Sequence, residues 1–149
     1  MANNAQFQLS LPRLIIETIA VVKNVWLMRL FRSNKKLPLP PTNSSIHLSR
    51  KEIDSATKKI ENIVKLLIFW RRQRCVYRSY SLASILRKRG VNLIVNYGYI
   101  NLTSDKKNRG HCWLTLDGLL FHEPASTSED FPIMVGEESE NGIVYWVGE

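Results

Sequence analysis

The sequence predicts an α+β fold, in which helices from the first half of the chain pack on an antiparallel sheet from the second half. Apolar residues recur at intervals of three and four in three segments of the first half, which is typical of helices. From Val91 onward, β-branched and aromatic runs are separated by turn residues, which is typical of strands. With 149 residues and 44% hydrophobic content, we expect one domain: a helix and linker over residues 1–48 and a core over residues 49–149.

The first helix is expected from Pro12, which suits a first helical turn, to about Arg32. The apolar stripe predicted to face the core comprises Ile15, Ile16, Ile19, Val22, Trp26 and Leu30. The alternative is a groove for a peptide or a partner helix, because Trp26 and Phe31 are costly to expose. Charged residues interrupt this stretch, so we expect no membrane-spanning helix.

The next two helices carry clearer end signals. Three prolines and a Thr-Asn-Ser-Ser cluster indicate a linker over residues 33–48. Ser49 and Glu52 have the spacing of a capping box at the start of the second helix. The third helix is expected from Cys75, and Gly90 follows three basic residues as the residue that ends it.

The second half predicts four strands and one tight hairpin. The strands are expected over residues 91–102, 111–116, 119–121 and 143–147, with an acidic loop over residues 124–141. We expect Asp117-Gly118 to lie in a three-residue loop with a bulge, so that Thr115 faces Leu119.

The register of this hairpin decides which side chains share a face. In the bulged register, His111 lies directly opposite Glu123, with Trp113 on the same face and Cys112 directed into the core. A two-residue loop would put His111 and Glu123 on opposite faces.

Charge is strongly segregated along the chain. Residues 1–110 carry all 21 Lys and Arg residues and five acids, whereas residues 111–149 carry eight acids and no Lys or Arg. The simpler interpretation is attraction between the two parts of one fold, and the functional one is a basic docking surface. No zinc-finger, RNA-binding or helix-turn-helix pattern is present, so nucleic acid is not an expected partner.

Cys75 is the candidate nucleophile. A helix N-terminus stabilises a thiolate, and the neighbouring Arg71, Arg72, Arg74 and Arg78 act in the same direction. Taken alone, a cysteine on an apolar helix face is more often a small core residue.

His111 and Glu123 complete a set of groups for cysteine acyl-transfer chemistry, as base and orienting carboxylate. The alternative for Glu123 is a solvated hairpin carboxylate. A metal site from Cys75, His111, Cys112 and His122 is disfavoured, because neighbouring strand residues point apart and no chelating spacing is present. We expect no cofactor.

Two motifs carry a family resemblance. The pattern Cys-x-x-Arg-Ser-x-x-Leu-x-x-x-Leu-Arg-x-x-Gly over residues 75–90 and the pattern His-x-Trp-x-x-x-Asp-Gly over residues 111–118 resemble the transglutaminase-like superfamily. Within it, the chain is most similar to the B-type leader peptidases of lasso-peptide (microcin-type) biosynthesis. It departs from their pattern in having Glu123 where Asp is usual and Cys112 where Ala is usual.

The resemblance implies a papain-like cysteine protease that removes the leader from a precursor peptide by a Cys75, His111 and Glu123 triad. In addition, we expect Gln73 and Trp113 as oxyanion or support residues, and the basic residues Arg71, Arg72, Arg74 and Arg78 as a docking surface for the leader or a partner. The implied partners are the precursor peptide, a separate leader-recognition protein and an ATP-dependent lasso cyclase.

Two other functions stay open on the sequence. One is acyl or amide transfer by another transglutaminase-like enzyme, and the other is a non-catalytic peptide-binding scaffold. Two cysteines and the lack of a signal-peptide pattern favour the cytoplasm.

Overall fold

The computed structural model describes residues 9–30, 39–43, 45–69, 74–100, 109–127 and 133–136. Within these ranges, three helices precede four strands: α2 (Leu11–Leu30), α3 (Arg50–Leu67), α4 (Arg74–Arg87), β1 (Leu93–Ile100), β2 (Arg109–Leu116), β3 (Leu119–Leu120) and β4 (Ile133–Gly136). The predicted α+β fold is confirmed.

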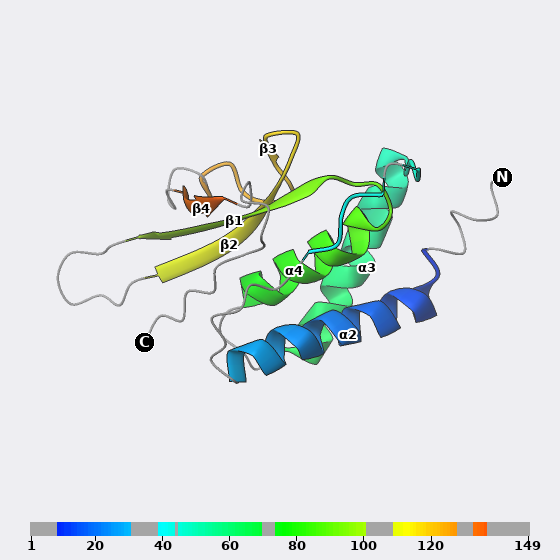
Figure 1. The fold of residues 1–149 in the computed structure, drawn as a ribbon, viewed down its shortest axis with the longest axis horizontal. Coiled ribbons are helices and arrows are strands. Elements are labelled where there is room, and N and C mark those ends of the chain that lie inside the picture. The colour runs from blue at the N-terminus through cyan, green and yellow to red at the C-terminus, as the bar shows by residue number, and fades with distance from the viewer. Residues whose placement is uncertain are drawn as a thin grey trace.

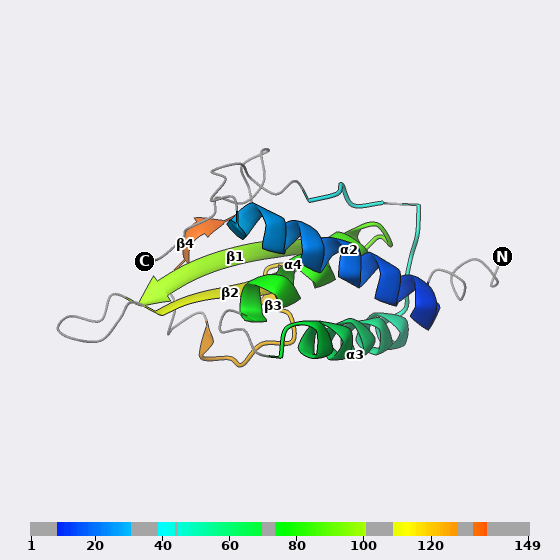
Figure 2. The same cartoon turned by 90° about the horizontal axis from the view of Figure 1, so that it is seen from below.

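The helices cover one side of the sheet (Figure 1). The strands pair antiparallel in the order β3-β2-β1-β4. Helix α4 packs on β1 and β2, and both α2 and α3 pack on α4, so α4 forms the middle of the structure (Figure 2). Its buried side chains include Tyr77, Tyr80, Leu82, Ile85 and Leu86. The helix that carries the candidate nucleophile in its first turn is therefore the most enclosed of the three described helices.

Helix α2 packs on the core with a different side from the one predicted. Leu14, Thr18 and Val25 are fully buried, whereas Ile16 is 68% exposed and Leu30 57% exposed. The prediction was wrong because this helix is apolar around most of its circumference, so periodicity does not select one side. Within the described ranges, no helix combines the length and the apolar character needed to cross a bilayer.

The ends of α3 and α4 follow the sequence signals. The capping box is present, since Ser49 Oγ accepts from the Glu52 N–H and the Glu52 carboxylate accepts from the Ser49 N–H. Gly90 follows α4 with a φ of +86°, and a Cβ there would lie 1.8 Å from the carbonyl oxygen of Ile46. The linker therefore crosses the end of α4 at a distance that only glycine allows.

Strand β4, at one edge of the sheet, was not predicted. Residues 133–136 form β4 on the free edge of β1, within the segment that the sequence indicates as an acidic loop. Four residues preceded by a proline are too short to show a strand pattern. The predicted strand at residues 143–147 lies outside the described residues.

The predicted register of the β2–β3 hairpin is wrong. Thr115 pairs with Leu120 and Leu116 with Leu119, so Asp117 and Gly118 form a two-residue loop. Both loop residues have positive φ, +52° and +78°, as the favoured two-residue hairpin turn requires. Along regular strands, this register would direct His111 and Glu123 to opposite faces of the sheet.

Candidate active site

Cys75 lies in the first turn of α4 and is half-buried. Burial alone would raise the pKa of its thiol. Hydrogen bonds from His111 and from the backbone N–H groups of Cys112 and Val76 outweigh burial and hold the pKa of Cys75 below its usual range. The thiolate is thus stabilised locally, as nucleophilic cysteine chemistry requires.

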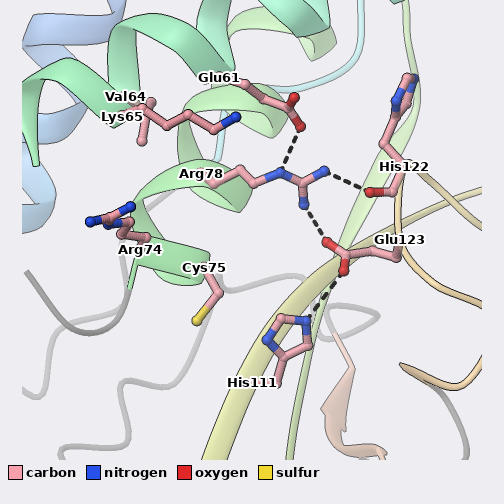
Figure 3. A pocket seen from close by; sticks show the side chains of 9 residues that line it. All are labelled: Glu61, Val64, Lys65, Arg74, Cys75, Arg78, His111, His122 and Glu123. Carbon is pink, nitrogen blue, oxygen red and sulfur yellow. Dashed lines mark hydrogen bonds and ion pairs between the residues drawn. The ribbon is translucent and has the colours of Figure 1, made fainter. Parts of the chain in front are cut away.

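His111 lies on β2 and bridges the thiol and a carboxylate. Its Nε2 is 3.3 Å from Glu123 Oε2, and the opposite side of the ring faces the Cys75 sulfur (Figure 3). Hydrogen bonds to Cys75 and Glu123 raise the pKa of His111 to about 9, although burial opposes the shift. Trp113, which is 1% exposed, stacks on the imidazole with ring centroids 5.9 Å apart. The His111 imidazole is therefore held by Trp113 on its face and by Glu123 at its edge.

Glu123 reaches His111 because the chain turns after β3. The last ladder bond runs from the Phe121 N–H to the Leu114 carbonyl, at 2.9 Å. His122 then adopts a left-handed backbone with φ +53°, which interrupts the alternation of side chains. The contact between His111 and Glu123 follows from this break, and not from the bulged register that the sequence indicated.

The nucleophile helix is tied to the strand that carries the base. Ser79, one turn after Cys75, donates from its hydroxyl to the Cys112 carbonyl oxygen at 3.1 Å. Cys112 is fully buried and directed into the core, as expected, and burial raises the pKa of its thiol. The two cysteines thus lie in opposite electrostatic environments.

Arg78 lies inside the site. Its guanidinium donates to Glu61, to Glu123 and to the carbonyl oxygen of His122, and its side chain is 20% exposed. A side chain with three partners in the pocket is poorly suited to the docking surface to which the sequence assigned it. Arg74 is exposed and bonds the Phe69 carbonyl.

A pocket of about 380 Å³ opens beside the nucleophile. It is lined by Glu61, Val64, Lys65, Arg74, Cys75, Arg78, His111, His122 and Glu123. Three other predicted site residues, Arg71, Arg72 and Gln73, lie outside the described residues. Within the described ranges, no cluster of His, Cys, Asp or Glu is placed to hold a metal ion.

Sequence reasoning missed the contributions of α3 to the site. Glu61 bonds Arg78, and Asp54 lies 3.1 Å from His122 Nε2. The two acids are seven residues apart and so share one side of a helix that is otherwise rich in lysine. That spacing was the available signal, although it does not show which basic residue each acid meets.

The sequence profile of the transglutaminase-like superfamily matches residues 18–136. The chain belongs to the transglutaminase-like superfamily. This superfamily includes cysteine peptidases and transferases. The matched span of this transglutaminase-like chain contains the whole pocket around Cys75. Comparisons with curated proteins and with solved structures give no match.

Proposed function

We propose that the protein is a cysteine peptidase that removes the leader from a lasso-peptide precursor. The arrangement that carries the proposal is the His111 imidazole between the Cys75 thiol and the Glu123 carboxylate. Nucleophile, base and orienting acid lie in the relation that cysteine acyl-transfer enzymes use. The motifs that resemble the leader peptidases, at residues 75–90 and 111–118, supply the first two of these groups.

The chemistry proceeds through a thioester. The Cys75 thiolate attacks the scissile carbonyl carbon, and the backbone N–H of Cys75 at the start of α4 is a donor for the oxyanion. The His111 imidazolium then protonates the leaving amine, and the C–N bond breaks. Neutral His111 next takes a proton from water, which attacks the thioester carbonyl and releases the leader as a free carboxylate, with the thiol restored.

The proposed partners follow from the product. Leader removal frees the N-terminal amine of the core peptide, which an ATP-dependent cyclase can join to an acidic side chain in the cytoplasm. Within the described part of residues 1–70, only the helices α2 and α3 are present, which supports recruitment of the precursor by a separate recognition protein. Arg74, exposed at the pocket, belongs to the proposed docking surface with Arg71 and Arg72.

The test is cleavage of the cognate precursor in the presence of its recognition protein, followed by intact mass. Wild type should release leader and core, and Cys75→Ala should release neither. Equal cleavage by both proteins would remove Cys75 from the mechanism. Incorporation of an added amine into the leader, in place of water, would instead identify an acyl transferase.

A further inference from the structure

Arg78 connects three elements at the base of the pocket. It lies on α4, one helical turn after Cys75. Its Nε donates to Glu61 Oε1 on α3 at 2.7 Å, its Nη2 donates to the His122 carbonyl oxygen at 2.9 Å, and its Nη1 donates to Glu123 Oε1. All three bonds are visible in Figure 3. Each nitrogen of the guanidinium therefore has a partner of its own.

The two oxygens of Glu123 are divided between two cationic partners. Oε1 accepts from Arg78, which leaves Oε2 facing His111 at 3.3 Å. The Glu123 side chain is only 8% exposed, so little water can replace either contact. The terminal torsion of a glutamate is intrinsically broad, and a planar guanidinium with fixed donors narrows it. The orientation of the carboxylate plane is thus set from the side opposite to His111.

The backbone around Glu123 provides little of this control. The last ladder bond of this segment is at Phe121, and His122 turns the chain out of the strand. Arg78 holds both the His122 carbonyl and the Glu123 carboxylate, so it fixes this segment on the same helix that carries Cys75. Glu61 in turn fixes the guanidinium from α3.

We propose that Arg78 is the positioning residue of this site, which orients the Glu123 carboxylate on His111, and that Glu61 holds Arg78 for this purpose. The role reaches the reacting atoms through Glu123 and His111, so Arg78 is not itself catalytic. The competing explanation is a purely structural clamp between α3, α4 and the segment after β3. Only a measurement that reports on the protonation of the Cys75–His111 pair separates the positioning role from the structural clamp.

The first experiment measures the rate of Cys75 alkylation by iodoacetamide as a function of pH, which needs no substrate. Without an oriented Glu123 carboxylate, the His111 imidazolium is less stable, and the Cys75 thiolate that it stabilises is then less stable as well. In Arg78→Met, the acid limb of the profile should therefore move to higher pH, as in Glu123→Gln. The matched control is Arg13→Met, because Arg13 also bonds a carboxylate, Glu17 Oε1 at 3.1 Å, on a helix outside the pocket. An unchanged profile in folded Arg78→Met would overturn the proposal.

Arg78→Lys separates geometry from charge. Lysine keeps the positive charge but acts as a point donor, so it cannot hold Glu61, Glu123 and the His122 carbonyl together. We expect an intermediate acid limb between wild type and Arg78→Met. A profile identical to wild type would show that charge alone suffices and that the fork geometry has no orienting role.

Glu61→Gln keeps the test valid if Arg78→Met does not fold. It preserves side-chain volume but weakens the bond that holds the Arg78 guanidinium to α3. Because Arg78 still bonds Glu123, the acid limb should move in the same direction as in Arg78→Met, but by less. Far-ultraviolet circular dichroism and the melting temperature establish that each variant is folded. A folded Glu61→Gln with the profile of wild type would contradict the part assigned to Glu61.

Steady-state cleavage adds a second readout, which rests on the proposed function. Arg78→Met should lower kcat about 10- to 100-fold with KM little changed, because orienting partners act on chemistry more than on binding. The two assignments fail separately. A shifted alkylation profile without any precursor cleavage would support the positioning role of Arg78 and contradict the leader peptidase. Precursor cleavage with an unchanged alkylation profile in folded Arg78→Met would support the leader peptidase and contradict the positioning role.

Discussion

Cys75 and His111 each shift the pKa of the other, and the two shifts have opposite signs. The pKa of the thiol lies below its usual range, while that of the imidazole is raised to about 9. Between the two pKa values, the pair exists as thiolate and imidazolium. This is the protonation state from which attack and leaving-group protonation can follow directly.

The pair predicts a bell-shaped pH profile of kcat/KM. Activity should appear as the Cys75 thiolate forms, at a pH below the usual range of a cysteine thiol, and it should fall as His111 loses its proton near pH 9. His111→Ala removes the largest contribution that favours the thiolate, so burial should then move the acid limb of Cys75 alkylation upward. Alkylation by iodoacetamide, with mass mapping of the labelled peptide, measures this. An acid limb unchanged in His111→Ala would show that the imidazole does not stabilise the thiolate.

The charge around the pocket predicts a preference for anionic reagents. Both glutamates that line it, Glu61 and Glu123, bond Arg78, whereas Lys65 is exposed and has no carboxylate partner among the described residues. Iodoacetate should therefore alkylate Cys75 faster, relative to iodoacetamide, than it alkylates a free thiol, and added salt should reduce the ratio.

Two lysine variants on the same helix test that preference. Lys65→Gln should lower the ratio of the two alkylation rates, because it removes a cation from the pocket. Lys58→Gln, two turns earlier on α3 and outside the pocket lining, should leave the ratio unchanged. An equal effect of both substitutions would assign the preference to net charge and not to the pocket.

A buried ion pair fixes α2 on the end of α4. Arg89 Nη1 lies 2.8 Å from Glu17 Oε2, and the Arg89 side chain is 2% exposed. Burial acts to raise the pKa of Glu17, but Arg89 and Arg13 outweigh it and hold the pKa below 4.5. Glu17→Gln should lower the free energy of unfolding by about 2 kcal/mol at neutral pH, because it removes the negative charge that the buried Arg89 guanidinium faces on α2.

The pH dependence of that loss has a definite sign. A carboxyl whose pKa is lower in the folded state stabilises the protein above its unfolded pKa and loses this contribution as pH falls through its folded pKa. The difference between wild type and Glu17→Gln in urea unfolding should therefore shrink on acidification below pH 4.5. A difference independent of pH would show that the stability comes from packing alone.

Local signals in the sequence were sufficient to predict helix ends and turns, where the backbone conformation favours a few specific residue types. The Ser49–Glu52 capping box and the glycine after α4 lie where expected. The turn at Asp117-Gly118 is also present, but as a two-residue loop and not as the expected three-residue loop with a bulge. The fold class followed from the switch between helical and strand periodicity. The buried side of α2 could not be predicted, because a helix that is apolar around most of its circumference gives no signal for the side that faces the core.

The candidate site was predictable in its members and not in its geometry. Cys75, His111 and Glu123 are brought together, but by a left-handed residue after a two-residue hairpin, and such a backbone break has no composition signal when it occurs at histidine. The place of Arg78 in the site was also hidden, because its partners come from α3 and from the segment after β3. Long-range pairing of this kind depends on packing that a single sequence does not display.

The left-handed backbone of His122 can itself be tested, since it directs Glu123 to His111. A β-branched residue at φ +53° is strained by about 1–2 kcal/mol, whereas asparagine adopts this conformation readily. Both replacements remove the contact of the His122 ring with Asp54, so they differ chiefly in backbone preference. His122→Val should therefore shift the acid limb of Cys75 alkylation toward that of Glu123→Gln, and His122→Asn should keep it near wild type. If both variants keep the acid limb of wild type, the approach of Glu123 to His111 does not depend on the left-handed backbone of this residue.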